Sequence, residues 1–509
     1  MIRTERISLD NMKRTLFCSN VNKLLFIEGS KRCSVENCRC DETIVIDDLF
    51  ELYAHLYSLM DGNNIISYLD YYKRDPDFRN SDKAIFEMES KKWGEHIEVH
   101  PYDTIYSTKI DNELIPLLKS QFEDVTHAKQ FLIYTFAWIR IIDNHVGKLI
   151  DKNKQRRLDK FPIETKKGLL LINRRGGISA YVQEKTKKYL TDPNYYSLRK
   201  QIDSVFLIPY KDLTYEVNYL RLSLDKWRKW VEFLENVGEL KVAFVPGNIT
   251  SFQEYSWVIE DGGADRKLFT INGVKSKMHN ENIVKQLDLA LENSSNIIIF
   301  PELSVSLEMQ KTIIEKAKLS EEMPLVFPGS FHETSTKIFK DFEDEYCNYN
   351  YSLIHFGDNP TSIFKMNKFE FPPSNKFVDE LLDFQNSTGI ENISCLKRTL
   401  TLVDTPFGLL AILICIDYLI PEIQEILVNY NVSIVVVMSL TGNPSGSHFY
   451  EAMSRLGKIN STTTLLCNNP AGLYLGNHTE TVVAYFPRRG KLFTSDQHVV
   501  IEKIENMIK

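Results

Sequence analysis

The sequence predicts an α/β fold for its C-terminal half, residues 237–509, and a mainly α-helical N-terminal half, residues 1–236. After Leu240, short apolar runs alternate with segments whose apolar residues recur every three or four positions, as strands and helices alternate in an α/β domain. Before Asn236 the helical spacing dominates. A charged segment with a glycine, Glu235 to Leu240, separates the two patterns, so we place the domain boundary there.

The composition limits the class of protein. A chain of 509 residues is too long for one ordinary hydrophobic core, so two to four domains are expected. A formal net charge of -7 argues against adhesion of the whole protein to nucleic acid or an anionic membrane. The first residues are too charged for a secretory signal, and no apolar run approaches the length of a membrane span. The eight cysteines are spread unevenly, which favours reduced thiols, so a cytoplasmic protein is expected.

The N-terminal half contains no catalytic motif. Its helical spacing is clearest in three segments, Asp47–Met60, His127–Ile150 and Leu222–Glu235. Four cysteines near the start suggest a zinc site: Cys18, Cys33, Cys38 and Cys40. Their spacing matches no closed zinc-finger signature, so no metal is predicted.

The stretch from Lys148 to Lys188 is rich in Lys and Arg and poor in acids. Solvated helix faces and loops explain such a stretch, and a surface for nucleic acid or a partner protein is the alternative. The role of residues 1–236 therefore stays open between an accessory domain and a binding domain.

The C-terminal half presents an ordered series of strands and helices. Expected strands are Lys241–Asn248, Asn296–Phe300, Pro324–Ser330, a hairpin of Asn348–Phe356 and Thr361–Phe364, Leu409–Ile416, Ser433–Met438, Thr463–Cys467, Val482–Phe486 and Lys491–Thr494. Expected helices are Asn282–Glu292, Leu307–Leu319 and Tyr450–Asn460.

The stretch LLAILICIDYLIPE, Leu409 to Glu422, contains the strongest candidate for a reactive group. Its apolar run has the composition of a strand buried on both faces and carries Cys415 near its end. Asp417 and Pro421 then predict a sharp turn into a helix. A nucleophile is commonly exposed at such a turn, whereas a lone cysteine in an apolar run is more often a packing residue.

Three chemically complementary side chains follow strand-like runs in this half. Glu302 follows NIIIFP, Lys368 follows SIFKMN, and Cys415 follows AILI. A carboxylate can take the thiol proton, and a fixed cation lowers the thiol pKa and stabilises an oxyanion. Singly, each residue has a structural explanation, but together they indicate a catalytic triad.

The motifs around these residues resemble those of the nitrilase, or carbon–nitrogen hydrolase, superfamily. FPELS at Phe300–Ser304 is similar to the segment of the catalytic glutamate, and the series from Asn350 to K-x-x-F-x-P is similar to the lysine motif. Within it we prefer Lys368 to Lys365, because Phe371 and Pro373 then take the usual places. ICIDYLIPE resembles the nucleophile motif C-x-D-x-x-x-P-E at every specified position. Later segments, including MSLTGNP and NNPAG, continue the order, and the resemblance covers about Leu240 to Ile504.

Two positions depart from the family pattern. A second glutamate commonly stands about eight residues beyond the catalytic lysine, where this sequence has Lys376; Glu370 or Glu380 are the substitutes within reach. The usual Arg-Ala-x-Glu-Asn segment is replaced by RLGKIN, which lacks the acid before Asn460. His332 could line the pocket, but a lone histidine is more often structural, so it is not counted in the site.

The resemblance implies a four-layer α-β-β-α sandwich that hydrolyses a small amide through a Cys415 thioester, without cofactor or metal, and forms a homo-oligomer. Glu302 would be the base and Lys368 the oxyanion stabiliser. Nitrile hydrolysis and acyl transfer to an amine use the same groups. The alternative from another class is a recognition or effector module in a multi-component assembly linked to nucleic acid.

Overall fold

The computed structural model describes most of the C-terminal half and parts of the N-terminal half. The described residues are 25–26, 44–45, 49–61, 63–96, 118, 120–121, 124–152, 163–165, 167–172, 198, 202, 204–209, 215–222, 226, 229–230, 232, 239–263, 265–321, 323–338, 347–355, 360–371, 387–394, 398–405, 408–475, 479–487, 491–496 and 500–505. The four early cysteines and most of the basic stretch lie outside these ranges, so their predictions stay untested. Within the described ranges, no helix is both long and apolar enough to cross a membrane.

Contacts divide the chain into two compact units, and among the described residues the first unit ends at Pro209 and the second begins at Tyr215. This division precedes the boundary predicted at 236/237. The reason is β6 (Glu216–Arg221), which pairs in parallel with β17 (Thr399–Thr405) and so belongs to a sheet of the second unit.

The described part of the first unit combines helices with a small antiparallel sheet in the order β3-β4-β5. A carboxylate on one helix ties the two parts together, because Asp143 accepts hydrogen bonds from the backbone N–H groups of Ser204 (3.0 Å) and Val205 (2.8 Å). The elements are β1 (Leu25–Phe26), β2 (Ile44–Val45), α2 (Leu49–Met60), α3 (Asn63–Arg74), α4 (Pro76–His96), α6 (Ala128–Lys152), β3 (Ile163–Thr165), β4 (Gly168–Ile172) and β5 (Val205–Pro209).

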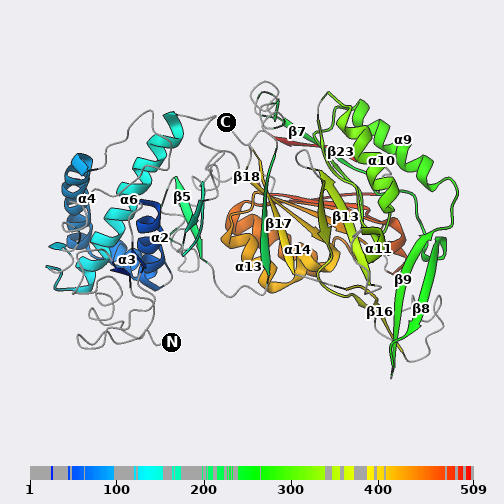
Figure 1. Ribbon diagram of the computed structural model, residues 1–509, viewed down its shortest axis with the longest axis horizontal. Coiled ribbons are helices and arrows are strands. Elements are labelled where there is room, and N and C mark those ends of the chain that lie inside the picture. The colour runs from blue at the N-terminus through cyan, green and yellow to red at the C-terminus, as the bar shows by residue number, and fades with distance from the viewer. Residues whose placement is uncertain are drawn as a thin grey trace. The chain divides into compact units, whose positions relative to one another are not determined.

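The second unit is built on two sheets that share one apolar core (Figure 1). The first has the order β11-β10-β7-β23 and consists of β7 (Glu239–Phe244), β10 (Ile297–Ile299), β11 (Leu325–Phe327) and β23 (Val500–Glu505). The second has the order β22-β21-β20-β19-β18-β17-β6 and adds β18 (Gly408–Ile414), β19 (Ile434–Ser439), β20 (Thr463–Asn468), β21 (Val482–Phe486) and β22 (Lys491–Ser495). Side chains such as Phe244 and Ile299 from the first sheet pack against Ile412 and Val436 from the second.

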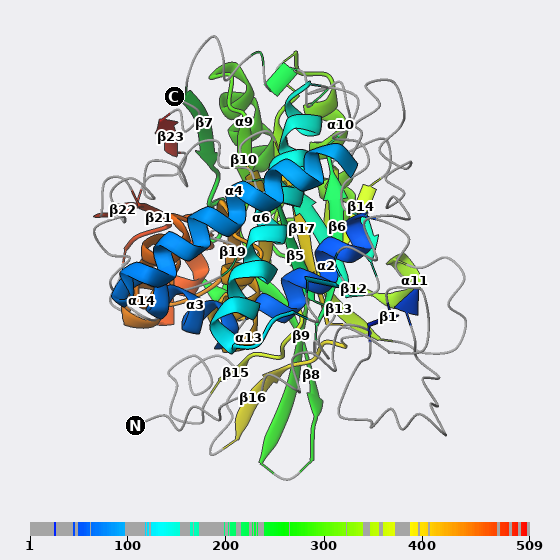
Figure 2. The same cartoon turned by 90° about the vertical axis from the view of Figure 1, so that its left-hand side faces the viewer.

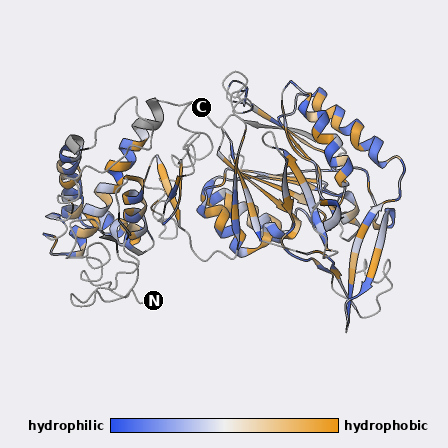
Figure 3. Cartoon of the chain, in the orientation of Figure 1, coloured by the Kyte–Doolittle hydropathy of each residue, from blue (hydrophilic) through white to orange (hydrophobic). Residues whose placement is uncertain are grey.

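Helices cover the outer face of each sheet. Helices α9 (His279–Glu292) and α10 (Leu307–Lys318) place apolar residues such as Leu287 and Ile313 against the first sheet. Helices α13 (Pro421–Asn429) and α14 (Ser447–Asn460) accompany the second. Figure 3 shows the expected hydropathy, with apolar strands inside and mixed faces on the helices. The described residues thus form a mixed α/β unit, as predicted.

Two smaller sheets complete the second unit. One has the order β12-β13-β14 and contains β12 (Phe331–Thr334), β13 (Asn348–His355) and β14 (Pro360–Phe364), with α11 (Ser335–Ile338) after β12. The other has the order β15-β16-β9-β8 and contains β8 (Tyr255–Asp261), β9 (Arg266–Val274), β15 (Glu370–Phe371) and β16 (Thr388–Glu391). The hairpin of β8 and β9 extends away from the two large sheets in both views (Figures 1 and 2).

Candidate active site

Cys415 stands at a sharp turn after β18. It begins the 3-10 helix η6 (Cys415–Leu419), and its φ of 50° lies in the left-handed region, which costs a non-glycine residue roughly 1–2 kcal/mol. Its thiol donates to the carbonyl of Leu440 at 3.6 Å and accepts from the hydroxyl of Ser439 at 3.5 Å. The side chain is almost fully enclosed, with 4% of the residue exposed. The predicted turn is therefore present and orients the thiol toward a buried site.

Glu302 occupies the loop between β10 and α10, and two side chains from elsewhere hold this loop. The amide of Asn469 donates to the carbonyl of Glu302 at 2.8 Å and to the hydroxyl of Tyr255 at 2.8 Å. That hydroxyl donates in turn to the carbonyl of Leu303 at 2.8 Å. Leu303 has a φ of 52°, so these bonds stabilise a strained turn.

Lys365, directly after β14, is the lysine that reaches this site. Its Nζ donates to Oε1 of Glu302 at 2.8 Å, and only 3% of the residue is exposed. Lys368, the residue preferred from the sequence, is exposed and lies outside the cluster. The structure therefore places Lys365, not the Lys368 preferred from the sequence, beside Glu302: Lys365 is buried directly after β14, whereas Lys368 faces solvent.

A buried carboxylate two residues after the nucleophile anchors the lysine loop. Asp417 accepts the backbone N–H of Met366 at 2.8 Å and the side-chain amide of Asn367 at 2.8 Å. Burial outweighs these bonds and raises the pKa of Asp417 to about 7. The nucleophile turn and the Lys365 loop are thus tied together directly.

A second glutamate completes the cluster, and the sequence analysis missed it. Glu391, at the end of β16, accepts Nζ of Lys365 on Oε2 at 2.5 Å. The side-chain amide of Asn350 bridges the carboxylates, donating to Glu391 at 2.9 Å and to Glu302 at 2.8 Å. Of the two substitutes that the sequence offered, Glu370 is exposed on β15 and Glu380 lies outside the described residues. Glu391 stands 26 positions beyond Lys365 (391 minus 365), far from the usual spacing.

Burial and the neighbouring charges shift the pKa values of the groups in this cluster, and the two glutamates shift in opposite directions. Burial opposes the charge of Lys365, but Glu302 and Glu391 outweigh it and raise the ammonium pKa well above its usual value. Burial raises the pKa of Glu302, against the effect of Lys365. For Glu391, Lys365 and His332 outweigh burial and hold the pKa at about 2. Burial and the charge of Glu302 raise the pKa of the Cys415 thiol to about 12.

An apolar and aromatic group surrounds this polar cluster. Residues of the β8–β9 hairpin pack with residues next to each catalytic candidate, including Leu303 beside Glu302 and Leu440 at the thiol. The ring of Phe369 lies 5.6 Å from Nζ of Lys365. The low-dielectric surroundings strengthen the charge interactions inside.

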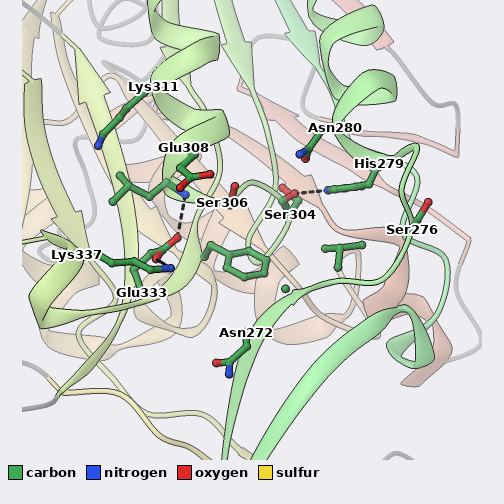
Figure 4. Close-up of a pocket in the computed structure, with 14 residues that line it drawn as sticks. Asn272, Ser276, His279, Asn280, Ser304, Ser306, Glu308, Lys311, Glu333 and Lys337 are labelled. Atoms are coloured by element: carbon green, nitrogen blue, oxygen red, sulfur yellow. Dashed lines mark hydrogen bonds and ion pairs between the residues drawn. The ribbon is translucent and has the colours of Figure 1, made fainter.

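A cavity of about 380 Å³ lies next to the Glu302 loop but is not lined by the cluster itself (Figure 4). Its walls include Ser304, Phe331 and Glu333. Side chains alternate along a strand, so Phe331 and Glu333 face this cavity while His332, between them on β12, faces the opposite side. A polar group in its wall is hydrogen-bonded to the protein backbone: Glu333 accepts a hydrogen bond from the N–H of Leu307 at 3.0 Å. Among the described residues, no group of His, Cys, Asp and Glu forms a metal site.

No family model and no curated protein matches the sequence. Solved structures that do match include nitrilase-superfamily and carbon–nitrogen hydrolase proteins, whose matches cover about half of this chain. Nit3 of Saccharomyces cerevisiae, a member of branch 10 of the nitrilase superfamily, is similar at 16% identity and a TM-score of 0.35, over 53% of this chain and 92% of its own.

Two bacterial structures match in a similar way. The carbon–nitrogen hydrolase of Helicobacter pylori G27 has 13% identity and a TM-score of 0.33, with 53% of this chain and 89% of its own covered. An amidase from Nesterenkonia sp. has 11% identity and a TM-score of 0.33, with 53% and 92% covered.

Proposed function

We propose that the second unit is a carbon–nitrogen hydrolase of the amidase type, built as a nitrilase-like four-layer sandwich, with Cys415 as nucleophile. The observation that carries this proposal is the buried cluster in which Lys365 bridges Glu302 and Glu391 beside the Cys415 thiol. A thiol, a base, a fixed cation and a second carboxylate in one enclosed site suit attack on a carbonyl followed by hydrolysis.

Glu302 is the proton carrier in this mechanism. The environment separates the pKa values of the two glutamates: it raises the pKa of Glu302 and holds that of Glu391 at about 2. The group with the raised pKa exchanges protons, and the other stays ionised. Since the thiol pKa is raised to about 12, Cys415 keeps its proton at rest and loses it to Glu302 as it attacks.

The first half-reaction forms a thioester. Sγ of Cys415 bonds to the amide carbon as Glu302 takes the thiol proton, and the carbonyl electrons move onto oxygen. Lys365 and the backbone N–H of Ile416 stabilise this oxyanion. The intermediate collapses, the carbon–nitrogen bond breaks, and Glu302 returns the proton to the leaving ammonia or amine.

The second half-reaction releases the acid. Glu302 takes a proton from water, which attacks the thioester. The carbon–sulfur bond then breaks, and Glu302 returns that proton to the sulfur, so the thiol and the carboxylate are both restored. Oε1 of Glu302 already accepts Lys365 and Asn350, so Oε2 is the oxygen that exchanges protons in both halves. Nitrile hydrolysis or transfer to an amine would use the same groups with another substrate or acceptor.

Intact mass after incubation with a panel of acyl-transferring amide probes tests the proposal. The parent protein is expected to gain one acyl group and to release ammonia or amine, whereas Cys415→Ala stays folded, gains no acyl group and does not turn over. Cys347→Ala, a half-buried thiol outside the cluster, is the matched control and should behave like the parent. Turnover by Cys415→Ala at the parent rate would refute the mechanism.

A binding module is the competing function, and it gives the opposite result. A Cys415 thiol that reacts with no probe, together with strongly salt-dependent binding of DNA or RNA, would favour it. The homo-oligomer and the cytoplasmic location remain predictions, which sedimentation and localisation of the tagged protein would test.

A further inference from the structure

His332 makes two hydrogen bonds that together determine its tautomer. The backbone N–H of Ile271 on β9 donates to Nδ1 at 2.8 Å, so Nδ1 carries no proton. Nε2 lies 2.9 Å from Oε1 of Glu391, and a carboxylate only accepts, so Nε2 carries the proton and donates it. The side chain is fully enclosed, so water does not compete for either bond.

We propose that His332 is a positioning residue for the proposed hydrolase, which fixes Glu391 against Lys365, and that β9 holds His332 in the tautomer required. This inference rests on the proposed function and extends it to a residue that does not touch the reacting atoms.

The hydrogen bonds of Glu391 show what His332 contributes. Among the described residues, Oε2 accepts a hydrogen bond from Lys365, whereas Oε1 accepts hydrogen bonds from Asn350 and His332. The amide of Asn350 also donates a hydrogen bond to Glu302, so Asn350 alone does not fix the orientation of the Glu391 carboxylate. Without the Nε2–H donor, the carboxylate can rotate about its terminal torsion and draw Lys365 away from its place beside Glu302.

Among the described residues, His332 forms its hydrogen bonds with Glu391 from β16 and the backbone N–H of Ile271 from β9, and Asn350 lies opposite it on β13. Beyond Glu391 lie Lys365, Glu302 and the thiol, which receive the effect only through Glu391. A displacement of about 1 Å in such a cluster costs about 100-fold in rate, which sets the upper limit of the expected effect.

Three substitutions separate positioning of Glu391 from anchoring of β9. Gln places an amide donor where Nε2 stands and keeps the bond to Glu391, whereas Asn places an acceptor where Nδ1 stands and keeps the bond to Ile271. His332→Ala is expected to lower kcat about 10- to 100-fold with KM changed less than threefold. His332→Gln should recover to within about fivefold of the parent, and His332→Asn should remain as slow as His332→Ala. Thermal unfolding of each variant verifies that it is folded.

Recovery by Asn alone, equal loss in all three variants, or parent activity in all three would overturn the proposal. A parent protein that turns over no probe would instead refute the proposed function. In that case the rate at which iodoacetamide alkylates Cys415 still tests His332. Alkylation should be slower in the Ala and Asn variants and restored in the Gln variant, because Lys365 then returns to its place near the thiol.

Discussion

Replacing Lys365 by Met tests the electrostatics of the site, because Met keeps the length of the side chain and removes the charge. In the parent, the ammonium lies 2.8 Å from Glu302 and 2.5 Å from Glu391, and all three groups are buried. The Lys365→Met variant would leave two buried carboxylates with only Asn350 between them.

The substitution is expected to lower both kcat and the free energy of unfolding. Loss of an oxyanion stabiliser lowers kcat about 10²- to 10³-fold. Removing one partner of a buried ion pair costs about 3–5 kcal/mol of unfolding free energy while the other charge stays ionised. The carboxylates can take up a proton, so their native pKa rises above the unfolded value of about 4.3. The folded variant then binds more protons than the unfolded chain, so its stability falls as pH rises, and the deficit against the parent should be larger at pH 8 than at pH 5.

Urea unfolding at pH 5 and pH 8, with turnover measured at pH 7.5, checks both effects. Lys368→Met is the matched control, since it removes an exposed lysine three positions away; it should keep parent kcat and stability within about 0.5 kcal/mol. If Lys368→Met lost turnover and Lys365→Met kept it, the assignment of the lysine would be wrong. An equal stability deficit at both pH values would refute the charge argument.

Two further predictions concern the groups that hold the cluster. Asp417 has a folded pKa of about 7, above its unfolded value of about 3.9, so it lowers the unfolding free energy as pH rises between these values, by at most about 4 kcal/mol. Asp417→Asn should therefore show a smaller decrease between pH 4.5 and pH 8 in urea unfolding, and an unchanged decrease would contradict the assignment. Asn469→Ala should lower kcat about tenfold and stability by about 1–3 kcal/mol, because the Glu302 turn loses its donor. Lower stability with unchanged kcat would limit Asn469 to a structural role.

Much of the second unit could be predicted because buried strands and amphipathic helices leave periodic patterns. The run before Cys415 forms β18, and the run before Glu302 forms β10, close to the expected bounds. The choice between Lys365 and Lys368 lacked such a pattern. Both follow the same strand, and the hydrogen bonds that Asp417 accepts from Met366 and Asn367, which hold the chain after Lys365, are tertiary contacts.

Glu391 could not be found by spacing, because tertiary pairing brings it to the site. Its strand β16 is four residues long, too short for a clear alternation, and follows a stretch outside the described residues. It pairs in parallel with β9, with Glu391 opposite Phe269, a contact between residues more than 100 positions apart. Composition and local periodicity contain no record of such a pairing.

The hairpin of β8 and β9 supports the two glutamates by independent contacts. At its start, Tyr255 holds the turn after Glu302 through the carbonyl of Leu303. Farther along, β9 pairs with the strand that ends in Glu391 and orients His332 through Ile271. Because both carboxylates depend on one hairpin, a change that displaces it should weaken proton transfer by Glu302 and the hold on Lys365 together. The distance between the two glutamates, which sets the place of the ammonium between them, therefore depends on this hairpin as well as on β10 and β20 of the large sheets, which place Glu302 and its donor Asn469.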